Sequence, residues 1–161
     1  MGVRRHGRRR AGRFPANRRG GLRDGGGRQL IFVDTSYWVA AQCRRDRHHE
    51  TAKALLERAR QRPLITSSHV RGETWTFLRR REGHGAAVAF LDMLERSPRA
   101  NVVMVSEQVE EDALRWLRRH DERPYSFVDA TSFGLMRALG IAEAFAFDGD
   151  FAAAGFVELR A

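Results

Sequence analysis

The sequence has one cysteine, Cys43, and one lysine, Lys53, among its 161 residues. A single cysteine cannot form a disulfide within the chain, which favours a reducing compartment such as the cytoplasm. No apolar run approaches the roughly 18 residues that a membrane-spanning helix needs. The arginine-rich start is not followed by the apolar segment of a secretory signal. We therefore expect a cytoplasmic protein with no membrane association.

The excess of positive charge is confined to residues 1–28. This stretch has ten arginines and one acid and so carries the whole formal net charge of +9, whereas residues 29–161 have 19 basic and 19 acidic residues. It is rich in glycine and poor in residues that could pack, so we predict a disordered basic extension. Three interpretations stay open: an arm that attracts RNA, a translated stretch upstream of the true start, and an extension without a role.

Apolar runs and helix-like segments alternate through residues 29–161, which we interpret as one folded domain. The strand-like runs are 30–33, 64–66, 102–105, 144–147 and 156–159, and the helix-like segments are 36–44, 48–61, 67–82, 86–95, 106–120 and 127–139. This alternation predicts an α/β/α sandwich around a mainly parallel sheet. In such sheets, ligands bind beyond the carboxyl ends of the strands, near a switch in strand order.

Two aspartates follow strand-like runs at the point where each run ends. Asp34 follows the run 30–33 and Asp148 follows the run 144–147, so both should lie at the ligand-binding edge of the sheet. Either one could instead cap the helix after it. Asp150 lies beyond Gly149, whose freedom at positive φ permits a sharp turn. We expect that turn to carry Asp150 away to cap a short helix, which leaves Asp148 as the preferred ligand and Asp150 as one that could bind through water.

Glu73 belongs to the predicted helix 67–82. It lies three residues after Val70 and four before Phe77, so it falls along an apolar stripe that also contains Leu78. A glutamate on a buried face is costly unless it is paired or bound to metal. The alternative is a position at the edge of the stripe, where the side chain reaches water.

Asp129 lies near the start of the predicted helix 127–139, whose only other charge is Arg137. Its spacing from Ser126 fits a capping box, with the acid at the third helical position. This role does not exclude metal binding.

The four carboxylates Asp34, Glu73, Asp129 and Asp148 together predict one site. Two like charges about 4 Å apart repel by roughly 4 kcal/mol at an effective dielectric constant near 20, so the cluster needs cations. Hard divalent ions with oxygen ligands, Mg²⁺ or Mn²⁺, meet that need. A carboxylate cage suits phosphodiester hydrolysis, because one ion lowers the pKa of a bound water and a second stabilises the leaving oxygen.

Other chemistries fit the sequence less well. No glycine-rich phosphate loop follows the first strand-like run, and the histidines have no zinc spacing with Cys43. His48 and His49, near Asp46, are interpreted as part of a solvated loop.

Four segments resemble, in order, the motifs of the PIN-domain family and, within it, of the VapC toxins: 31–36, 67–76, 125–141 and 147–151. The resemblance covers about residues 30–159. It implies a Rossmann-like PIN fold, RNA cleavage that depends on Mg²⁺ or Mn²⁺, a toxin homodimer, and a small cognate antitoxin that covers the site. It assigns the acidic roles to the four carboxylates, with possible support from nearby residues: Thr35, Ser36, Thr131, Ser132 and Asp150.

Two other functions stay open beside that of a toxin ribonuclease. One is a housekeeping PIN-domain nuclease that processes RNA without an antitoxin. The other is a non-catalytic RNA-binding module, against which the clustered carboxylates speak, because a binder of polyanions gains nothing from them. A neighbouring gene for a small DNA-binding antitoxin would separate the toxin from the housekeeping enzyme.

Overall fold

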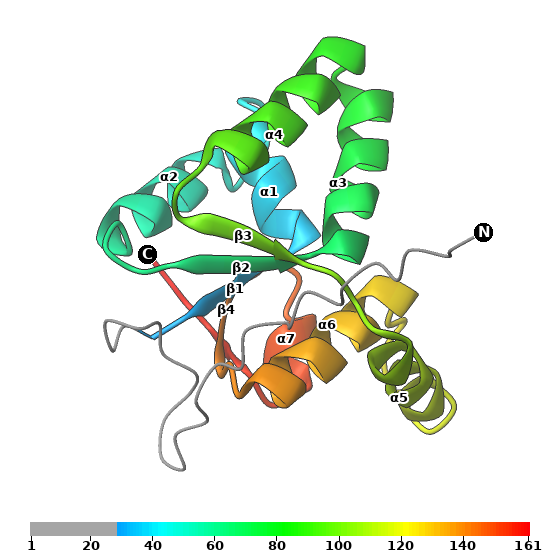
Figure 1. Ribbon diagram of the computed structural model, residues 1–161. Coiled ribbons are helices and arrows are strands. Elements are labelled where there is room, and N and C mark those ends of the chain that lie inside the picture. Colours follow the sequence, from blue (N-terminus) through cyan, green and yellow to red (C-terminus); the bar gives the residue numbers. More distant parts are fainter. Residues whose placement is uncertain (1–28) are drawn as a thin grey trace, which may run out of the picture.

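The computed structural model describes residues 29–161 (Figure 1), and the basic extension predicted at residues 1–28 lies outside the described residues. The described part has five strands: β1 (Ile31–Val33), β2 (Leu64–Ser67), β3 (Ala100–Val103), β4 (Glu143–Phe145) and β5 (Val157–Glu158). It has seven helices: α1 (Thr35–Gln42), α2 (His49–Arg58), α3 (Ser68–Arg81), α4 (His84–Arg96), α5 (Glu107–Leu117), α6 (Phe127–Leu139) and α7 (Asp150–Ala153).

The five strands form one sheet in the order β3-β2-β1-β4-β5, and every neighbouring pair is parallel. The chain builds outward from β1 to β3 and then returns to the other side of β1 for β4 and β5. The switch in strand order therefore lies between β1 and β4, which is where ligands bind in sheets of this kind. The predicted α/β class with a parallel sheet is confirmed.

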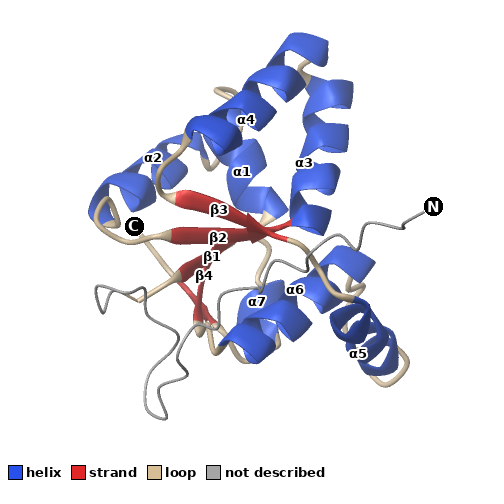
Figure 2. Ribbon diagram, viewed as in Figure 1, coloured by secondary structure: helices blue, strands red, loops and turns tan. Residues whose placement is uncertain are grey.

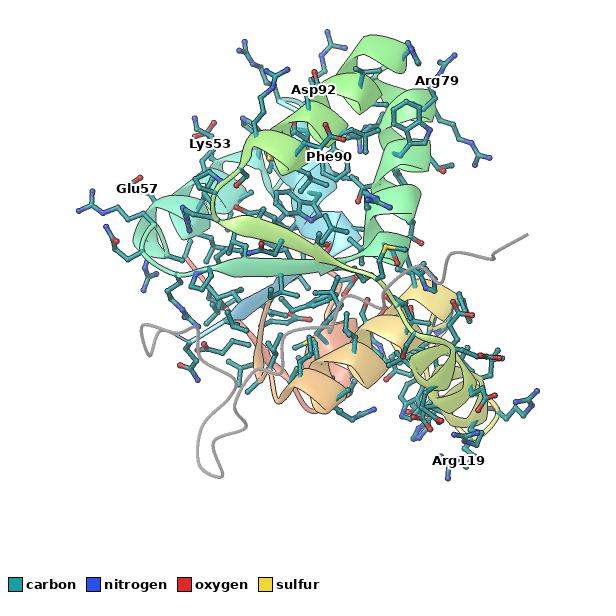
Figure 3. All side chains as sticks on the ribbon, in the orientation of Figure 1. Lys53, Glu57, Arg79, Phe90, Asp92 and Arg119 are labelled. Carbon is teal, nitrogen blue, oxygen red and sulfur yellow. The ribbon has the colours of Figure 1, made fainter. Side chains whose placement is uncertain are left out.

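Helices cover both faces of the sheet, as Figures 1 and 2 show. Helices α1 to α4 lie on one face and α5 to α7 on the other. Helices α3 and α4 pair as a hairpin that extends away from the sheet. In Figure 3 the side chain of Phe90 points into this layer, where it is fully buried, whereas Arg79 and Asp92 point outward. The hairpin therefore has an apolar inner side and a charged outer side.

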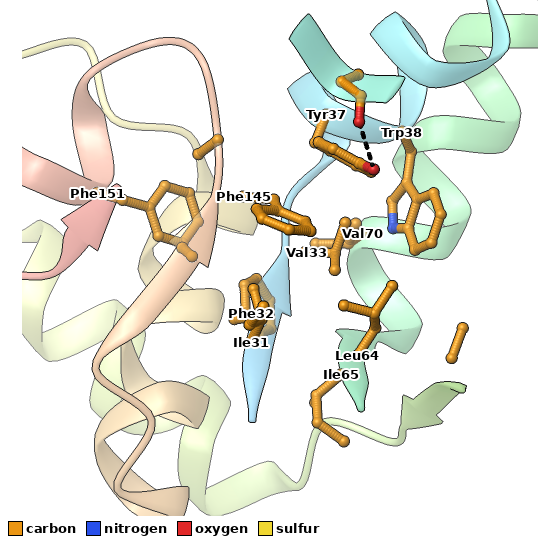
Figure 4. Packing of buried hydrophobic residues seen from close by; sticks show 14 of the residues in the cluster. Ile31, Phe32, Val33, Tyr37, Trp38, Leu64, Ile65, Val70, Phe145 and Phe151 are labelled. Carbon is orange, nitrogen blue, oxygen red and sulfur yellow. Dashed lines mark hydrogen bonds between the residues drawn. The ribbon is translucent and has the colours of Figure 1, made fainter. Parts of the chain in front are cut away.

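The central strand is buried on both faces, since Ile31, Phe32 and Val33 have no exposed surface. Figure 4 shows the packing around it, with Tyr37 of α1 stacked on Phe145 of β4 at a centroid distance of 4.8 Å. Fully burying an aliphatic or aromatic side chain contributes roughly 1.5–3 kcal/mol. The core thus fixes β1 and β4, the two strands that flank the switch in strand order.

Three helices begin at the carboxyl edge of the sheet with capping side chains. Asp34 caps α1 and accepts a hydrogen bond from the Ser36 backbone N–H, and Ser67 caps α3 in the same way. Ser126 caps α6 within a complete capping box that includes Asp129, as the sequence predicted. Each cap satisfies backbone N–H groups that the first helical turn leaves free. The caps therefore fix how these helices enter the edge where the candidate site lies.

The observed β3 differs from the predicted strand 102–105. It spans Ala100–Val103, because its register is set by pairing with β2, which matches Leu64 to Ala100. Met104, which the apolar run included, is 69% exposed. Likewise β4 ends at Phe145 and not at residue 147. Hydrophobicity located both strands but misplaced their ends, because the apolar runs continue past the last paired residue.

The prediction that Phe77 lies on the inward stripe of α3 is wrong, since its side chain is 52% exposed. The buried positions of the helix are Val70, Thr74 and Leu78. They are spaced by four residues, so the stripe runs one position away from Glu73. Glu73 consequently lies at the border of the buried face, half-buried. Within residues 29–161, no helix combines the length and the apolar character that a membrane span requires.

Candidate active site

A cavity of about 390 Å³ opens at the carboxyl edge of the sheet, where α1, α3 and α6 begin. All four carboxylates that the sequence singled out line it: Asp34, Glu73, Asp129 and Asp148. They come from four segments that are far apart in the chain. The parallel topology therefore brings the predicted acidic residues together at the switch between β1 and β4.

Asp34 is the most buried of the four, with 3% of its surface exposed. Its Oδ2 accepts hydrogen bonds from the backbone N–H of Ser36 at 2.8 Å and from the Ser36 hydroxyl at 2.7 Å. The same hydroxyl oxygen accepts a hydrogen bond from the Phe147 N–H at 3.0 Å. Ser36 thus fixes the Asp34 carboxylate and ties it to the segment that carries Asp148.

Glu73 is held from across the cavity edge by Thr35. The Thr35 hydroxyl donates a 2.6 Å hydrogen bond to Oε2 of Glu73. This contact joins the first turn of α1 to α3. The border position of Glu73 matches the alternative weighed for it, in which the side chain reaches water, yet it still lines the cavity.

Asp129 is buried with 9% of its surface exposed. Its Oδ2 accepts a 2.7 Å hydrogen bond from the Ser126 N–H, which is one half of the capping box. The capping box uses only Oδ2 of Asp129, so Oδ1 keeps its lone pairs for a further partner.

Asp148 lies at the mouth of the cavity and is the most exposed of the four carboxylates, and its Oδ1 accepts a 3.0 Å hydrogen bond from the Asp150 N–H. Gly149 adopts φ 82°, the sharp turn expected there. The predicted capping role of Asp150 is wrong, because Gly149 is the N-cap of α7 and Asp150 is its first helical residue. Asp150 instead pairs with Arg123, whose Nε lies 2.5 Å from its Oδ1.

Asp129, Asp148 and Asp150 form the tightest group of possible metal ligands among the described residues. Each offers a carboxylate oxygen, and the three oxygens lie within 4.8 Å of one another. Asp34 and Glu73 line the same cavity but stand outside this trio. Asp150, to which the sequence gave a supporting place, therefore lies close to Asp129 and Asp148, although it does not line the cavity.

The carboxylates of the cavity shift one another's pKa. Burial, and next to it the charge of Asp148, raises the pKa of Asp34 to about 7. Partial burial also raises the pKa of Glu73, of Asp129 and of Asp148, each with a contribution from a neighbouring carboxylate. Like charges in a desolvated space favour the protonated form. A cation in the cavity would reverse that preference, so this donor set fits a hard divalent metal ion.

Thr131 and Ser132, the other predicted supporting residues, are fully buried on α6 and do not line the cavity. The Thr131 hydroxyl donates to the backbone carbonyl of Val128, within its own helix. The lining also includes residues that were not assigned to the site: Asp46, Arg47, His48, Phe77, Arg81 and Phe147. Part of the loop interpreted as solvated thus forms the cavity, because His48 stacks on Phe147 at 4.5 Å.

A parallel α/β sheet with a carboxylate-lined cavity at its switch point is an architecture suited to metal-dependent hydrolysis of phosphodiesters. The sequence matches the PIN domain family over residues 31–157. The chain therefore belongs to the PIN-domain family, and the resemblance inferred from its four motifs is confirmed.

Relatives of known function refine this assignment. The chain is 56% identical over 132 residues to the 23S rRNA-specific endonuclease VapC20 of Mycobacterium tuberculosis, which covers 81% of this chain and 98% of that protein. The crystal structure of M. tuberculosis VapC20, a toxin that cleaves the sarcin–ricin loop, superposes with a TM-score of 0.76 at 54% identity, over 81% of this chain and 99% of that one. The structure of VapBC2 from Rickettsia felis matches with a TM-score of 0.62 at 14% identity, over 81% of this chain and 98% of that one, and shares the fold alone.

Proposed function

We propose that this chain is the endonuclease toxin of a VapBC-type toxin–antitoxin pair and that it cleaves ribosomal RNA at the sarcin–ricin loop. The observation that carries the proposal is the convergence of Asp34, Glu73, Asp129 and Asp148 on one cavity. The high identity to a 23S rRNA-specific endonuclease, over nearly the whole of that protein, supports the choice of RNA.

Asp34, Asp129 and Asp148 would hold Mg²⁺ or Mn²⁺, with Glu73 at the border of the cavity. Such ions prefer carboxylate oxygens, and their charge offsets the mutual repulsion of the cluster. A bound ion would supply a nucleophilic hydroxide at neutral pH and neutralise charge on the leaving oxygen. Asp150 is the weaker ligand, because Arg123 already occupies one of its oxygens.

Residues around the carboxylates orient them. Ser36 holds Asp34 through two hydrogen bonds to one oxygen, and Thr35 holds Glu73. Ser126 holds Asp129 through the capping box. Fixed orientation keeps the charged oxygens converging on the same space, so the protein does not have to reorganise when metal and RNA bind.

The partners follow from the family. A small antitoxin would cover the acidic cavity, and an arginine of that protein could pair with two carboxylates in place of metal. We also propose that the toxin forms a homodimer and acts in the cytoplasm, where the ribosomes are.

The proposal is tested by cleavage of a synthetic RNA hairpin that copies the sarcin–ricin loop. The protein should cut the hairpin with Mg²⁺ or Mn²⁺ and stop when EDTA is added. Asp34→Asn should remove most cleavage and keep the fold. Asp92→Asn is the matched control, because Asp92 points outward on α4 and does not line the cavity. Equal cleavage by both variants, in preparations free of contaminating nuclease, would refute the role of the carboxylates.

A housekeeping nuclease would cleave RNA by the same chemistry, but it would not arrest growth and would have no antitoxin. A toxin should arrest bacterial growth when it is expressed alone, and the product of a neighbouring antitoxin gene should restore growth. If soluble, active nuclease leaves growth unchanged, the chain is an RNA-processing enzyme. The non-catalytic binding module is excluded if Asp34→Asn keeps RNA affinity while it abolishes cleavage.

A further inference from the structure

The cavity is lined by more than its carboxylates. Two arginines and an exposed phenylalanine, Arg47, Arg81 and Phe77, share its wall and take no part in the chemistry described above. An acidic cavity repels the phosphates of RNA, so substrate binding requires cationic or stacking groups nearby. These three side chains provide such groups at the cavity itself, beside the stacked pair of His48 and Phe147.

Three of the lining residues form one row on α3. Glu73, Phe77 and Arg81 are spaced by four residues, so they lie on one face of the helix, with about 6 Å of axial rise between successive members. The row leads from a carboxylate at the acidic centre to an aromatic ring and then to a guanidinium. A strand that leaves the acidic centre along α3 would meet the ring before the charge.

Phe77 is an aromatic ring with a free face. It is 52% exposed, and within residues 29–161 it makes no ring contact and does not belong to the packed core. A phenylalanine with about half of its surface exposed contributes less to the stability of the fold than a fully buried one. Aromatic side chains on RNA-binding surfaces stack on unpaired bases.

Asp46 holds Arg81 directly, and His48 connects it to Arg47. The Asp46 carboxylate accepts a 2.9 Å hydrogen bond from the His48 N–H and lies 3.4 Å from Nη1 of Arg81. Arg47 donates from Nε to the His48 ring nitrogen Nε2 at 3.0 Å, and the described residues give it no ion pair. The ion pair between Asp46 and Arg81 thereby joins the loop before α2 to the end of α3. Guanidinium groups bind phosphate oxygens through paired hydrogen bonds.

We propose that Phe77 stacks on an unpaired base next to the cleaved phosphodiester, while Arg47 and Arg81 bind the adjoining phosphate. The inference rests on the proposed function and adds the means by which the chain selects its RNA. A base inside a duplex is covered by its neighbours on both faces and cannot stack on Phe77. Phe77 and the two arginines therefore restrict cleavage to loops and other unpaired segments.

The first test measures binding of the sarcin–ricin hairpin to the Asp34→Asn protein, so that cleavage does not interfere. Phe77→Trp should keep the affinity, and Phe77→Leu should lower it about ten-fold, since leucine keeps apolar surface but has no ring to stack. The melting temperature of each variant should stay unchanged, because Phe77 lies outside the core. If Phe77→Leu binds as tightly as the parent, the stacking role is wrong, and an apolar protein contact, for example with an antitoxin, explains the exposed ring.

The second test concerns the arginines. Arg47→Gln and Arg81→Gln should each reduce the slope of log affinity against log salt concentration by about one, the signature of one lost phosphate contact. Arg79→Gln and Arg80→Gln are matched controls, because both residues lie on α3 but do not line the cavity. Equal slopes for Arg80→Gln and Arg81→Gln would overturn the assignment of Arg81.

The third test locates the stacked base. Single abasic nucleotides placed in turn through the loop should give one position at which Phe77→Leu no longer lowers affinity, since the partner is already absent. If no position in the loop has this effect, the proposal is contradicted. These outcomes are separable from those of the proposed function. If Asp34→Asn abolishes cleavage but the Phe77 and arginine variants bind as the parent does, the nuclease assignment stands and only this inference fails.

Discussion

The hydroxyl of Thr35 donates a 2.6 Å hydrogen bond to Oε2 of Glu73 and so links the residue after Asp34 to α3. Thr35 is buried, whereas Glu73 is half-buried and lies at the border of its helix. Without this bond, the long glutamate side chain would be free to turn toward solvent. The geometry of the acidic cavity thus depends on a residue that carries no charge.

Replacing Thr35 tests this dependence. Thr35→Val keeps the shape of the side chain but removes the donor, so cleavage should fall about ten-fold while the fold remains intact. Thr35→Ser keeps the hydroxyl and should retain most of the activity. Cleavage rates and melting temperatures of the two variants provide the comparison. Equal rates for valine and serine would show that Glu73 does not need this contact.

The metal-free protein should be less stable at pH 8 than at pH 5. The pKa of Asp34 is about 7 in the folded chain and near 4 when unfolded, so the folded state holds its proton more tightly. The stability that this group contributes is present below pH 4 and is lost as the pH rises to 7. The pKa difference corresponds to a loss of roughly 4 kcal/mol, at most, in the free energy of unfolding.

Thermal melts in EDTA measure this effect. Asp34→Asn should flatten the pH dependence of the melting temperature, and Asp92→Asn should leave it unchanged. Adding Mg²⁺ should raise the melting temperature more at pH 8 than at pH 5, because the ion binds the deprotonated carboxylates. A metal-free protein that is most stable at pH 8 would contradict the assigned coupling among the carboxylates.

Asp148→Asn should reduce metal-dependent cleavage more than Asp150→Asn does. Both carboxylates lie close to Asp129, but Arg123 pairs with Asp150 and competes with metal for it. Arg123→Gln should free Asp150 and tighten metal binding, which calorimetry with Mn²⁺ would measure. The reverse rank order of the two aspartate variants, at equal folding, would make Asp150 the principal ligand.

A shortened chain that begins at Gln29 should fold and keep metal-dependent cleavage. The family match and the core both lie within the described residues, and the Gln29 carbonyl accepts a 3.0 Å hydrogen bond from Nε of Arg62. The comparison is made by circular dichroism and by hairpin cleavage at two salt concentrations. A weaker salt dependence after shortening would identify residues 1–28 as an RNA-attracting arm. Loss of folding would show that these residues belong to the domain.

The sequence was sufficient to predict where the acidic residues meet, because that follows from topology. Asp34 and Asp148 end neighbouring parallel strands, and alternation of strands and helices implies that such ends share one edge. The capping box of Ser126 and Asp129 was predictable because it depends only on the spacing of two nearby residues. Strand order and the capping pattern therefore account for Asp34, Asp148 and Asp129, whereas Glu73 lines the cavity from the border of the buried face of α3.

What the sequence could not predict depends on contacts between distant segments. The buried face of α3 was misplaced by one position, because spacings of three and of four both fit an apolar stripe, and only packing against α1, α4 and α6 chooses between them. The pairing of Asp150 with Arg123 spans 27 residues and involves a loop without a periodic pattern. The approach of His48 to Phe147 likewise depends on how the chain folds back onto the sheet.

The central place of β1 in the sheet determines which part of the chain completes the cavity. β1, β2 and β3 leave the ribosome first, and chains fold from the N-terminal side as they emerge. At that stage one edge of β1 is still unpaired, and both Asp129 and Asp148 are missing from the cavity. Only the arrival of β4 covers that edge and brings the last carboxylate into place. A chain that ends before β4 therefore leaves an apolar strand edge unpaired and lacks the last carboxylate of the cavity.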